Sequence, residues 1–439
     1  MSSRRWSSFL ERHQCAVWTE LARQALEEME DESSSSSSSS NSSISSGSSM
    51  DVSDDEDDEW NDDDDISDDE LSFAFNFAFN KATALAHKLN QPVEHQGIQW
   101  RRKHGLKIVE LSSDDGLTFF RFRTEHLQEL SDKLWPRLSG YLVGTKEKIR
   151  FGKEKYSAPF ETLFLLCLYR LARPNCVRRE MEGFFGYKKS KISAGVRAML
   201  DALYSLSIKY LDNPALFHHQ MTGYAQIVNA KTVLSNNIWG FIDGTLRHTC
   251  RPTYHQKLMY SGHKRHHGMK FQSVVTPDGL FACMFGAING NRHDSYMMTQ
   301  SGLLQKLRDL MPAGNEQDGG EDHIFALYAD PAYPLSAHIF GGYRHPAPGS
   351  REALWNTLMS SVRESVEWGF AHINRHWAFL NNKSQMKIFK APIAKYYIVG
   401  TFLCNLRTCF YGNQTMSFFD CADFSMKLDE YLALIDDAE

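Results

Sequence analysis

The sequence predicts a mixed α/β domain, a sheet flanked by helices, that follows an all-α segment and an acidic tail. Three observations lead to this organisation. A low-complexity stretch rich in Ser and Asp runs from about residue 30 to residue 70. Apolar residues then recur at helical spacing between residues 157 and 205. From residue 236 onward, short apolar runs of strand length replace that pattern.

The acidic tail hides the charge of the rest of the chain. Residues 27–70 contain 19 acidic residues and no Lys or Arg, so they cannot bury enough apolar surface to offset the entropy lost on ordering. We therefore expect disorder from about 30 to 70, either as a solvated extension or as an interaction tail. Without these 19 acids, 35 acidic residues remain against 48 basic ones, a surplus of 13 positive charges. This surplus suits nucleic acid as a partner, although an ordinary basic enzyme surface has the same composition.

The cellular setting is predicted from what the sequence lacks. It has no apolar run long enough to span a membrane and no apolar segment typical of a secretory signal. The 8 cysteines form no Cys-x-x-Cys pair, which favours reduced thiols in an intracellular protein. We expect no membrane partner.

The helical part is predicted in two pieces, 71–156 and 157–235. Thr124 is a plausible N-cap of a helix that runs to about Leu134. From Phe160 to Leu203, apolar positions at spacings of three and four predict three helices, separated near Pro174 and Gly186. A short helix, a tight turn and a helix that starts with basic residues are typical of a helix-turn-helix DNA reader, with plain three-helix packing as the alternative. The candidate DNA-binding residues here are Lys188, Lys189, Lys191 and Arg197.

The α/β part is predicted from a series of strands and helices. We expect strands at 236–242, 270–275, 280–287 and 324–328, with a hairpin turn at 276–279. Helices are expected at about 295–310 and from about Ser350. In the second of these, the apolar stripe Leu354, Leu358, Val362, Val366 and Phe370 predicts one face packed on the sheet.

This order of elements is that of a ribonuclease-H-like domain, in which the first and fourth strands are neighbours. Asp243 directly follows the first strand, and we expect the strand to end there because Gly244 signals a turn. Asp330 follows the fourth strand, so the two acids can meet at one edge of the sheet. Glu367 lies beside the buried stripe of the last helix and can face them.

Three converging carboxylates would repel one another unless a cation separated them. Mg²⁺ prefers oxygen ligands and usually keeps waters, which leaves room for a substrate phosphate. Two such ions can support in-line phosphodiester cleavage or strand transfer. The sequence therefore predicts a catalytic metal site at Asp243, Asp330 and Glu367, for Mg²⁺ or Mn²⁺.

Longer motifs around these acids resemble those of a known family. The matching segments include Gly240-Phe241-Ile242-Asp243-Gly244-Thr245, Asp330-Pro331-Ala332-Tyr333-Pro334-Leu335 and the run from Val362 to Phe370. They resemble the DDE transposases of the PIF/Harbinger superfamily and the nuclease-like proteins derived from them. The resemblance covers about 155 to 415 and excludes the tail.

The resemblance implies a nuclease or transposase that is active on terminal inverted repeats in the nucleus. It places Asp243, Asp330 and Glu367 on the family's three metal-binding acids. It also implies a separate Myb-like DNA-binding partner. A homo-oligomer and some cytoplasmic protein are further expectations. The expected organisation is an N-terminal segment (1–70), a helical region (71–156), a DNA-binding region (157–235), a DDE domain (236–412) and a C-terminal tail (413–439).

Several assignments stay open on sequence alone. Asp294 is either the N-cap of a helix, which is the simpler interpretation, or a fourth acid near the metals. Glu364 lies one helical turn before Glu367 and could replace it. Lys264 and Arg265 belong to a basic loop that suits phosphate contact better than zinc. The alternative to an active enzyme is a domesticated, non-cleaving factor that binds DNA or protein.

Overall fold

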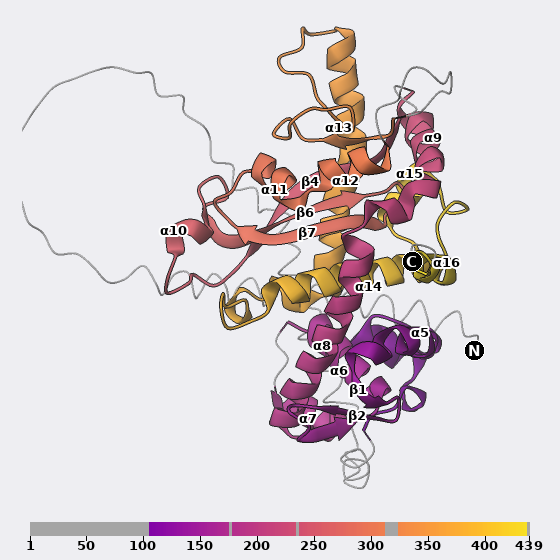
Figure 1. Ribbon diagram of the computed structural model, residues 1–439, viewed down its shortest axis with the longest axis vertical. Coiled ribbons are helices and arrows are strands. Elements are labelled where there is room, and N and C mark those ends of the chain that lie inside the picture. The colour runs from indigo at the N-terminus through magenta and orange to yellow at the C-terminus, as the bar shows by residue number, and fades with distance from the viewer. Residues whose placement is uncertain (1–104, 175–177, 234–236, 312–323, 437–439) are drawn as a thin grey trace, which may run out of the picture. The chain divides into compact units, whose positions relative to one another are not determined.

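The centre of the fold is a mixed sheet, seen in the computed structural model, which describes residues 105–174, 178–233, 237–311 and 324–436 (Figure 1). The predicted disordered tail and the first part of the predicted helical region, 71–104, lie outside these residues. All described residues belong to one compact unit, 93–439. The sheet's strands are β4 (Ile238–His248), β5 (Tyr260–Ser261), β6 (His266–Val275), β7 (Phe281–Asn289), β8 (Ala326–Ala329) and β9 (Ile339–Gly341).

The pairing of the strands places the predicted first and fourth strands side by side. β4 lies between β6, with which it is antiparallel, and β8, with which it is parallel. β9 extends the parallel side and β7 pairs with the outer edge of β6. This mixed sheet with flanking helices fits the ribonuclease-H-like α/β class that the order of elements predicted.

One detail of the prediction is wrong, because β4 does not end at Asp243. The strand continues to His248, with Gly244 paired to Gln272 and His248 paired to Gly268 on β6. Gly244 permits a turn but does not force one, and the partner strand keeps it extended. Asp243 therefore lies in the interior of β4, anchored on both sides along the chain.

The long helix α13 (Arg351–His376) leaves the start of its predicted buried stripe exposed. Val362 and Val366 are buried, whereas Leu354 is 56% exposed although it belongs to the predicted buried stripe. Figure 1 shows the N-terminal end of α13 extending beyond the strands. The helix expected at 295–310 is two helices, α11 (Asp294–Ser301) and α12 (Leu303–Leu310), because Gly302 adopts a left-handed conformation between them.

The helical part contains the three helices predicted between 157 and 205. They are α6 (Phe160–Ala172), α7 (Arg178–Phe185) and α8 (Lys189–Leu211). The Thr124 cap is wrong: its hydroxyl donates to the carbonyl of Ser112 at 2.8 Å, and α5 (Thr124–Leu138) has no side-chain cap. Whether these helices read DNA stays a prediction.

The remaining elements complete this unit. A small antiparallel sheet consists of β1 (Val143–Thr145), β2 (Lys148–Phe151) and β3 (Tyr156–Ala158). The other α-helices are α4 (Ser113–Asp115), α9 (Met221–Thr232), α10 (Gln256–Met259), α14 (Ile393–Tyr411), α15 (Gln414–Phe419) and α16 (Leu428–Ala433). Short 3₁₀ or π turns lie at 108–110, 116–120, 139–141, 214–220, 378–381 and 383–385.

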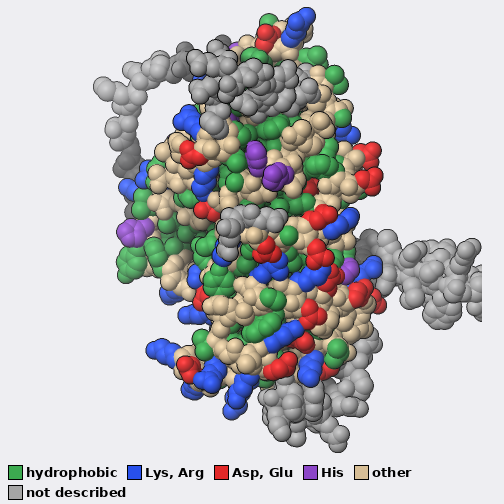
Figure 2. Space-filling view, turned by 45° about the vertical axis from the view of Figure 1, so that its right-hand side comes forward, with side chains coloured by type: hydrophobic (Ala, Val, Ile, Leu, Met, Phe, Trp, Pro, Cys, Tyr) green, Lys and Arg blue, Asp and Glu red, His purple; other side chains and the backbone are tan. Residues whose placement is uncertain are grey.

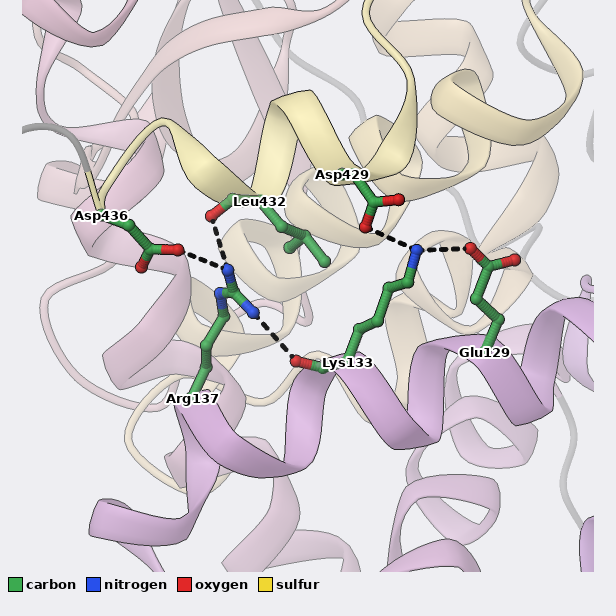
Figure 3. A network of polar contacts seen from close by, with 6 residues as sticks. All are labelled: Glu129, Lys133, Arg137, Asp429, Leu432 and Asp436. Carbon is green, nitrogen blue, oxygen red and sulfur yellow. Dashed lines mark hydrogen bonds and ion pairs between the residues drawn. The ribbon is translucent and has the colours of Figure 1, made fainter.

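The C-terminal end is held to the helical part by a polar network (Figure 3). Lys133 on α5 lies between Glu129, at 2.7 Å, and Asp429, at 2.5 Å. Arg137, one turn further along α5, pairs with Asp436 at 2.6 Å and donates to the carbonyl of Leu432. These contacts tie α16 to α5. Within the described ranges, no helix is both long and apolar enough to cross a membrane.

Candidate active site

Two of the three predicted acids lie on adjacent parallel strands. Ile242 on β4 is paired with Ala329 on β8, so the next residues along the two strands are Asp243 and Asp330. The Asp243 carboxylate accepts the backbone N–H of Gly244 at 2.7 Å, and the Asp330 carboxylate accepts that of Ala332 at 2.8 Å. Each backbone bond fixes one carboxylate oxygen and leaves the other free for a second partner.

Arg363 connects Asp243 to the third predicted acid. From α13, its guanidinium lies 3.1 Å from the Asp243 carboxylate and 3.3 Å from the carboxylate of Glu367, one helical turn later. The side chains of Arg363 and Asp243 are 21% and 17% exposed, whereas that of Glu367 is 55% exposed. Glu367 therefore reaches the site from the solvent side, and Arg363 is the cation that the two acids share.

The electrostatics of Asp243 reflect this crowding. Burial is the main cause that raises its pKa from 3.8 to about 6. The Gly244 N–H and Arg363 oppose the rise, and the negative charges of Glu367 and Asp330 add to it. Asp243 therefore interacts with both other predicted acids, and a further cation would favour its ionised form.

Asp294 lies near the site and does not cap α11. The N-cap position is His293, which makes no side-chain cap, and the Asp294 carboxylate pairs with Lys270 on β6 at 3.0 Å. A β-carbon built on Gly244 would lie 2.9 Å from the same carboxylate. The structure thus rejects the capping interpretation and brings a fourth acid close to the residue that follows Asp243.

Tyr333 is a residue for which the sequence suggested no role. Its side chain is 3% exposed, and its hydroxyl has no hydrogen-bond partner among the described residues. Burial raises its pKa well above the ordinary value, and the charges of Asp294, Asp243 and Asp330 raise it further. The hydroxyl is therefore a free donor close to three carboxylates.

Arg363 and Lys270 were also missed as parts of the site. The spacing of Arg363 and Glu367, four residues apart on one helix, was a signal for an ion pair. Nothing local to the sequence indicated the pairing of Lys270 with Asp294, because these residues belong to different elements. Glu364, the alternative to Glu367, is exposed on α13.

The predicted DNA-binding residues fall into two separate groups. Lys188 and Lys189 are exposed at the start of α8, and Arg197 is exposed about two turns further along the helix. Lys191 lies 3.4 Å from the ring centre of Tyr187. In the view of Figure 2, Lys and Arg side chains gather at the lower end of the molecule. Lys264 and Arg265 are exposed in the turn between β5 and β6.

The described residues form no preformed metal cage. In the part of the chain that the structure describes, no group of three or more His, Cys, Asp or Glu side chains is arranged to hold a metal ion. The donor set nevertheless suits a hard cation, because it consists of carboxylate oxygens. Burial is the main cause of the raised pKa of Asp243, and the negative charges of Glu367 and Asp330 add to it. Arg363, a cation shared by two of these acids, would have to release them.

A ribonuclease-H-like sheet with acids at the junction of two parallel strands defines an α/β protein with a carboxylate site. Residues 242–405 match the family model described as DDE superfamily endonuclease. The match starts one residue before Asp243 and includes Asp330, Arg363 and Glu367. It supports a DDE transposase-like family and a nuclease- or transposase-like function for this segment, with DNA as the implied substrate. Comparisons with curated proteins and with solved structures gave no match.

Proposed function

We propose that residues 236–412 form a divalent-metal-dependent DNA endonuclease or transposase domain of the PIF/Harbinger type. The observation that carries the proposal is the meeting of Asp243 and Asp330 on adjacent parallel strands, with Glu367 linked to Asp243 through Arg363. These residues all fall inside the segment that matches the endonuclease family.

In this proposal Asp243, Asp330 and Glu367 hold Mg²⁺ or Mn²⁺. Such ions, when bound, neutralise charge on the phosphodiester and lower the barrier to its in-line displacement. The chain positions its own groups for this: β4 and β8 fix the two aspartates, and α13 supplies the glutamate. Arg363 keeps Asp243 and Glu367 paired until they are needed as ligands. Tyr333 offers a hydroxyl donor that interacts with the charges of Asp243 and Asp330.

A nicking assay with Mg²⁺ or Mn²⁺ on DNA that carries the element's own ends tests this proposal. We expect Asp243→Asn to lower the rate by a factor on the order of 10² or more, since removing a charged catalytic group typically costs several kcal/mol. Glu364→Gln is the matched control, because it removes one carboxylate a helical turn from Glu367. It should stay within about twofold of wild type. Equal nicking by wild type and Asp243→Asn would contradict the proposal.

Arg363 also supports a second candidate function, a DNA- or protein-binding factor that no longer cleaves. Because Arg363 already pairs with both Asp243 and Glu367, these two acids have a cationic partner without a metal. This candidate predicts DNA binding without Mg²⁺-dependent nicking in the wild type, so the same assay separates the two functions.

We propose in addition that α8 binds DNA through Lys188, Lys189, Lys191 and Arg197, and that Lys264 and Arg265 contact phosphate. The exposure of five of these six side chains and the resemblance to transposases support this. Nuclear localisation, a Myb-like partner and a homo-oligomer are proposals that the resemblance alone carries.

Neutralising Lys188, Lys189 and Lys191 to Gln should weaken DNA binding and reduce its salt dependence by about 0.9 per lost phosphate contact. Fluorescence anisotropy at several salt concentrations measures both effects. The matched control neutralises three exposed lysines in one other segment, Lys383, Lys387 and Lys390. If both triple variants bind with the same affinity and salt slope, α8 is not the DNA-binding element.

A further inference from the structure

A cavity of about 170 Å³ lies beside the C-terminal half of α13, apart from the acids at Asp243. Side chains of α13 form one wall, and the residues at the start of α15 form the other. The polar and aromatic side chains that line it include Trp368, His372, Arg375, His376, Asn413 and Gln414.

Three of the side chains that line the cavity, His372, Arg375 and His376, are cationic or can become so. His372 and His376 are one helical turn apart, with ring centres separated by 4.4 Å. Burial is the main cause that lowers the pKa of His372 to about 3, and Arg407 and Arg375 lower it further. His376 is shifted in the same direction by burial and by Arg407. Both imidazoles are therefore neutral near pH 7 and stand close to permanent positive charge.

Three arginines lie in or near the cavity: Arg375 lines it, and Arg407 and Arg121 interact with His376. Arg407 packs against the rings of Phe122 and Tyr411, and its Nε has no hydrogen-bond partner in the described part of the chain. Arg121 is satisfied differently, because it donates to three backbone carbonyls, one of them that of His376. Over the described ranges no carboxylate forms an ion pair with Arg121, Arg375 or Arg407. Arg375 lines the cavity and is exposed, so its guanidinium is open to an anion that enters from solvent, and Arg407 and Arg121 add positive charge nearby.

We propose that this cavity binds a phosphate group of the DNA strand on which the proposed active site acts. Phosphate matches the donor set, since a guanidinium fork binds its oxygens in pairs and neutral imidazoles add single N–H donors. This inference rests on the proposed function for its choice of DNA as the source of the phosphate.

The position of the cavity on α13 supports that choice. Arg375 follows Glu367 by eight residues, which corresponds to about 12 Å along a helix axis. Along its axis, B-form DNA advances about 3.4 Å per phosphate of one strand, so in a duplex that runs along α13 a phosphate three or four steps from the acids would lie beside Arg375. Trp368, between the two sites, offers a flat aromatic surface on the rim.

The test measures DNA binding by the full chain with EDTA present, so that cleavage plays no part. Arg375→Ala should weaken binding about three- to tenfold and reduce the slope of log Kd against log salt by about 0.9, the value for one lost phosphate contact. Gln414→Glu places a carboxylate at the rim and should have the same effect. Arg375→Lys should keep the slope, because the charge remains, but bind more weakly since the fork is lost.

Two control variants remove or add equivalent charges elsewhere. Arg351→Ala removes an exposed arginine from the first turn of α13, and Gln385→Glu adds a carboxylate to an exposed turn. Both should bind DNA like wild type. If Arg375→Ala and Gln414→Glu do not differ from these controls, the proposal is overturned.

A second measurement separates the two sources of phosphate. Thermal unfolding is followed with inorganic phosphate against chloride at equal ionic strength, for wild type and Arg375→Ala. Stabilisation that is lost in Arg375→Ala, together with an unchanged DNA salt slope, would identify free phosphate as the ligand and overturn the DNA assignment. These two assays contain no divalent ion, so their outcome does not depend on whether the protein nicks DNA. The phosphate proposal and the proposed nuclease function can therefore be rejected independently of each other.

Discussion

At Asp243, burial and neighbouring charge act on one carboxyl in opposite directions. Arg363 and the Gly244 N–H favour the ionised form, yet burial outweighs them and the pKa rises to about 6. In an unfolded chain this carboxyl titrates near 3.9. The folded protein therefore binds the proton more tightly than the unfolded chain does, and the stability that this proton contributes is lost as the pH rises through 6.

This difference predicts how Asp243→Asn changes stability with pH. In EDTA, the free energy of unfolding of the variant relative to wild type should rise by up to about 3 kcal/mol between pH 4 and pH 7. Urea denaturation at a series of pH values measures it. The depressed pKa values of His372 and His376 reduce stability below about pH 6.5 in both proteins, so they cancel in the comparison. Glu364→Gln, at an exposed carboxyl, should change the free energy of unfolding by the same amount at every pH. The same result for Asp243→Asn would show that the pKa of Asp243 is not raised in the folded protein.

The acidic residues of the site could be predicted from the sequence. Asp243 and Asp330 follow apolar runs, and the strand order implied that they meet. The spacing of Arg363 and Glu367 signalled their ion pair, but the pairing of Arg363 with Asp243 was not predictable, because it depends on packing between distant segments. The same holds for the Tyr333 hydroxyl, which has no hydrogen-bond partner among the described residues. Asp294 was read as a cap because its neighbours in sequence suggest one, whereas its partner Lys270 lies 24 residues away.

Among the elements, β4 and α11 approach each other closely at Gly244. A β-carbon there would lie 2.7 Å from the terminal carbon of Met297 and 2.9 Å from the Asp294 carboxylate. Met297 can move because its side chain is flexible. Asp294 is held by Lys270, so a larger residue at 244 must displace α11.

Gly244→Ala should therefore destabilise the fold by about 1–3 kcal/mol, the usual cost of overpacking. It should also reduce nicking about tenfold or more, because a displacement on the order of 1 Å near a reacting group has effects of that size. Gly262→Ala is the control, since nothing lies within 4 Å of a β-carbon at that position. Urea denaturation and the nicking assay cover both effects, and equal behaviour of the two variants would show that the contact is not tight.

The lengths of elements show where local patterns stop being informative. The predicted end of β4 at Gly244 was wrong because β6 continues to pair with it as far as His248. Periodicity placed Leu354 and Val362 on one face of α13, but only Val362 has the sheet beneath it. A sequence pattern identifies a face, whereas the partner that covers it comes from elsewhere in the chain.

For the described unit as a whole, residues 413–436 are not a separate tail. Tyr431 is fully buried, accepts a hydrogen bond from Asn405 on α14 at 2.9 Å and stacks on Tyr210 of α8. The Tyr210 hydroxyl donates to the carbonyl of Leu432. The last described helix thus closes the core between α8 and α14, and the ion pairs of Figure 3 lie around this contact.

We expect Tyr431→Ala to lower the free energy of unfolding by about 3–5 kcal/mol, the range for removing a large buried aromatic side chain. Lys133→Met should lower it by less than about 1 kcal/mol, because its two ion pairs are partly exposed. Urea denaturation of both variants measures the difference. A larger loss for Lys133→Met would show that the polar network, and not the buried tyrosine, holds α16 in place.

The 26 residues of α13 form one uninterrupted helix that carries both Glu367 and Arg375. A helix turns about 100° and advances about 1.5 Å per residue. The number of residues between Glu367 and Arg375 therefore fixes both the distance and the angle between these two positions. If the cavity at Arg375 holds one phosphate of a strand, α13 then sets the distance between that phosphate and the acids. It selects the bond presented to the acids by its distance from a bound phosphate, independently of base sequence. One residue inserted between Glu367 and Arg375 would change both the distance and the angle between these two positions on the helix.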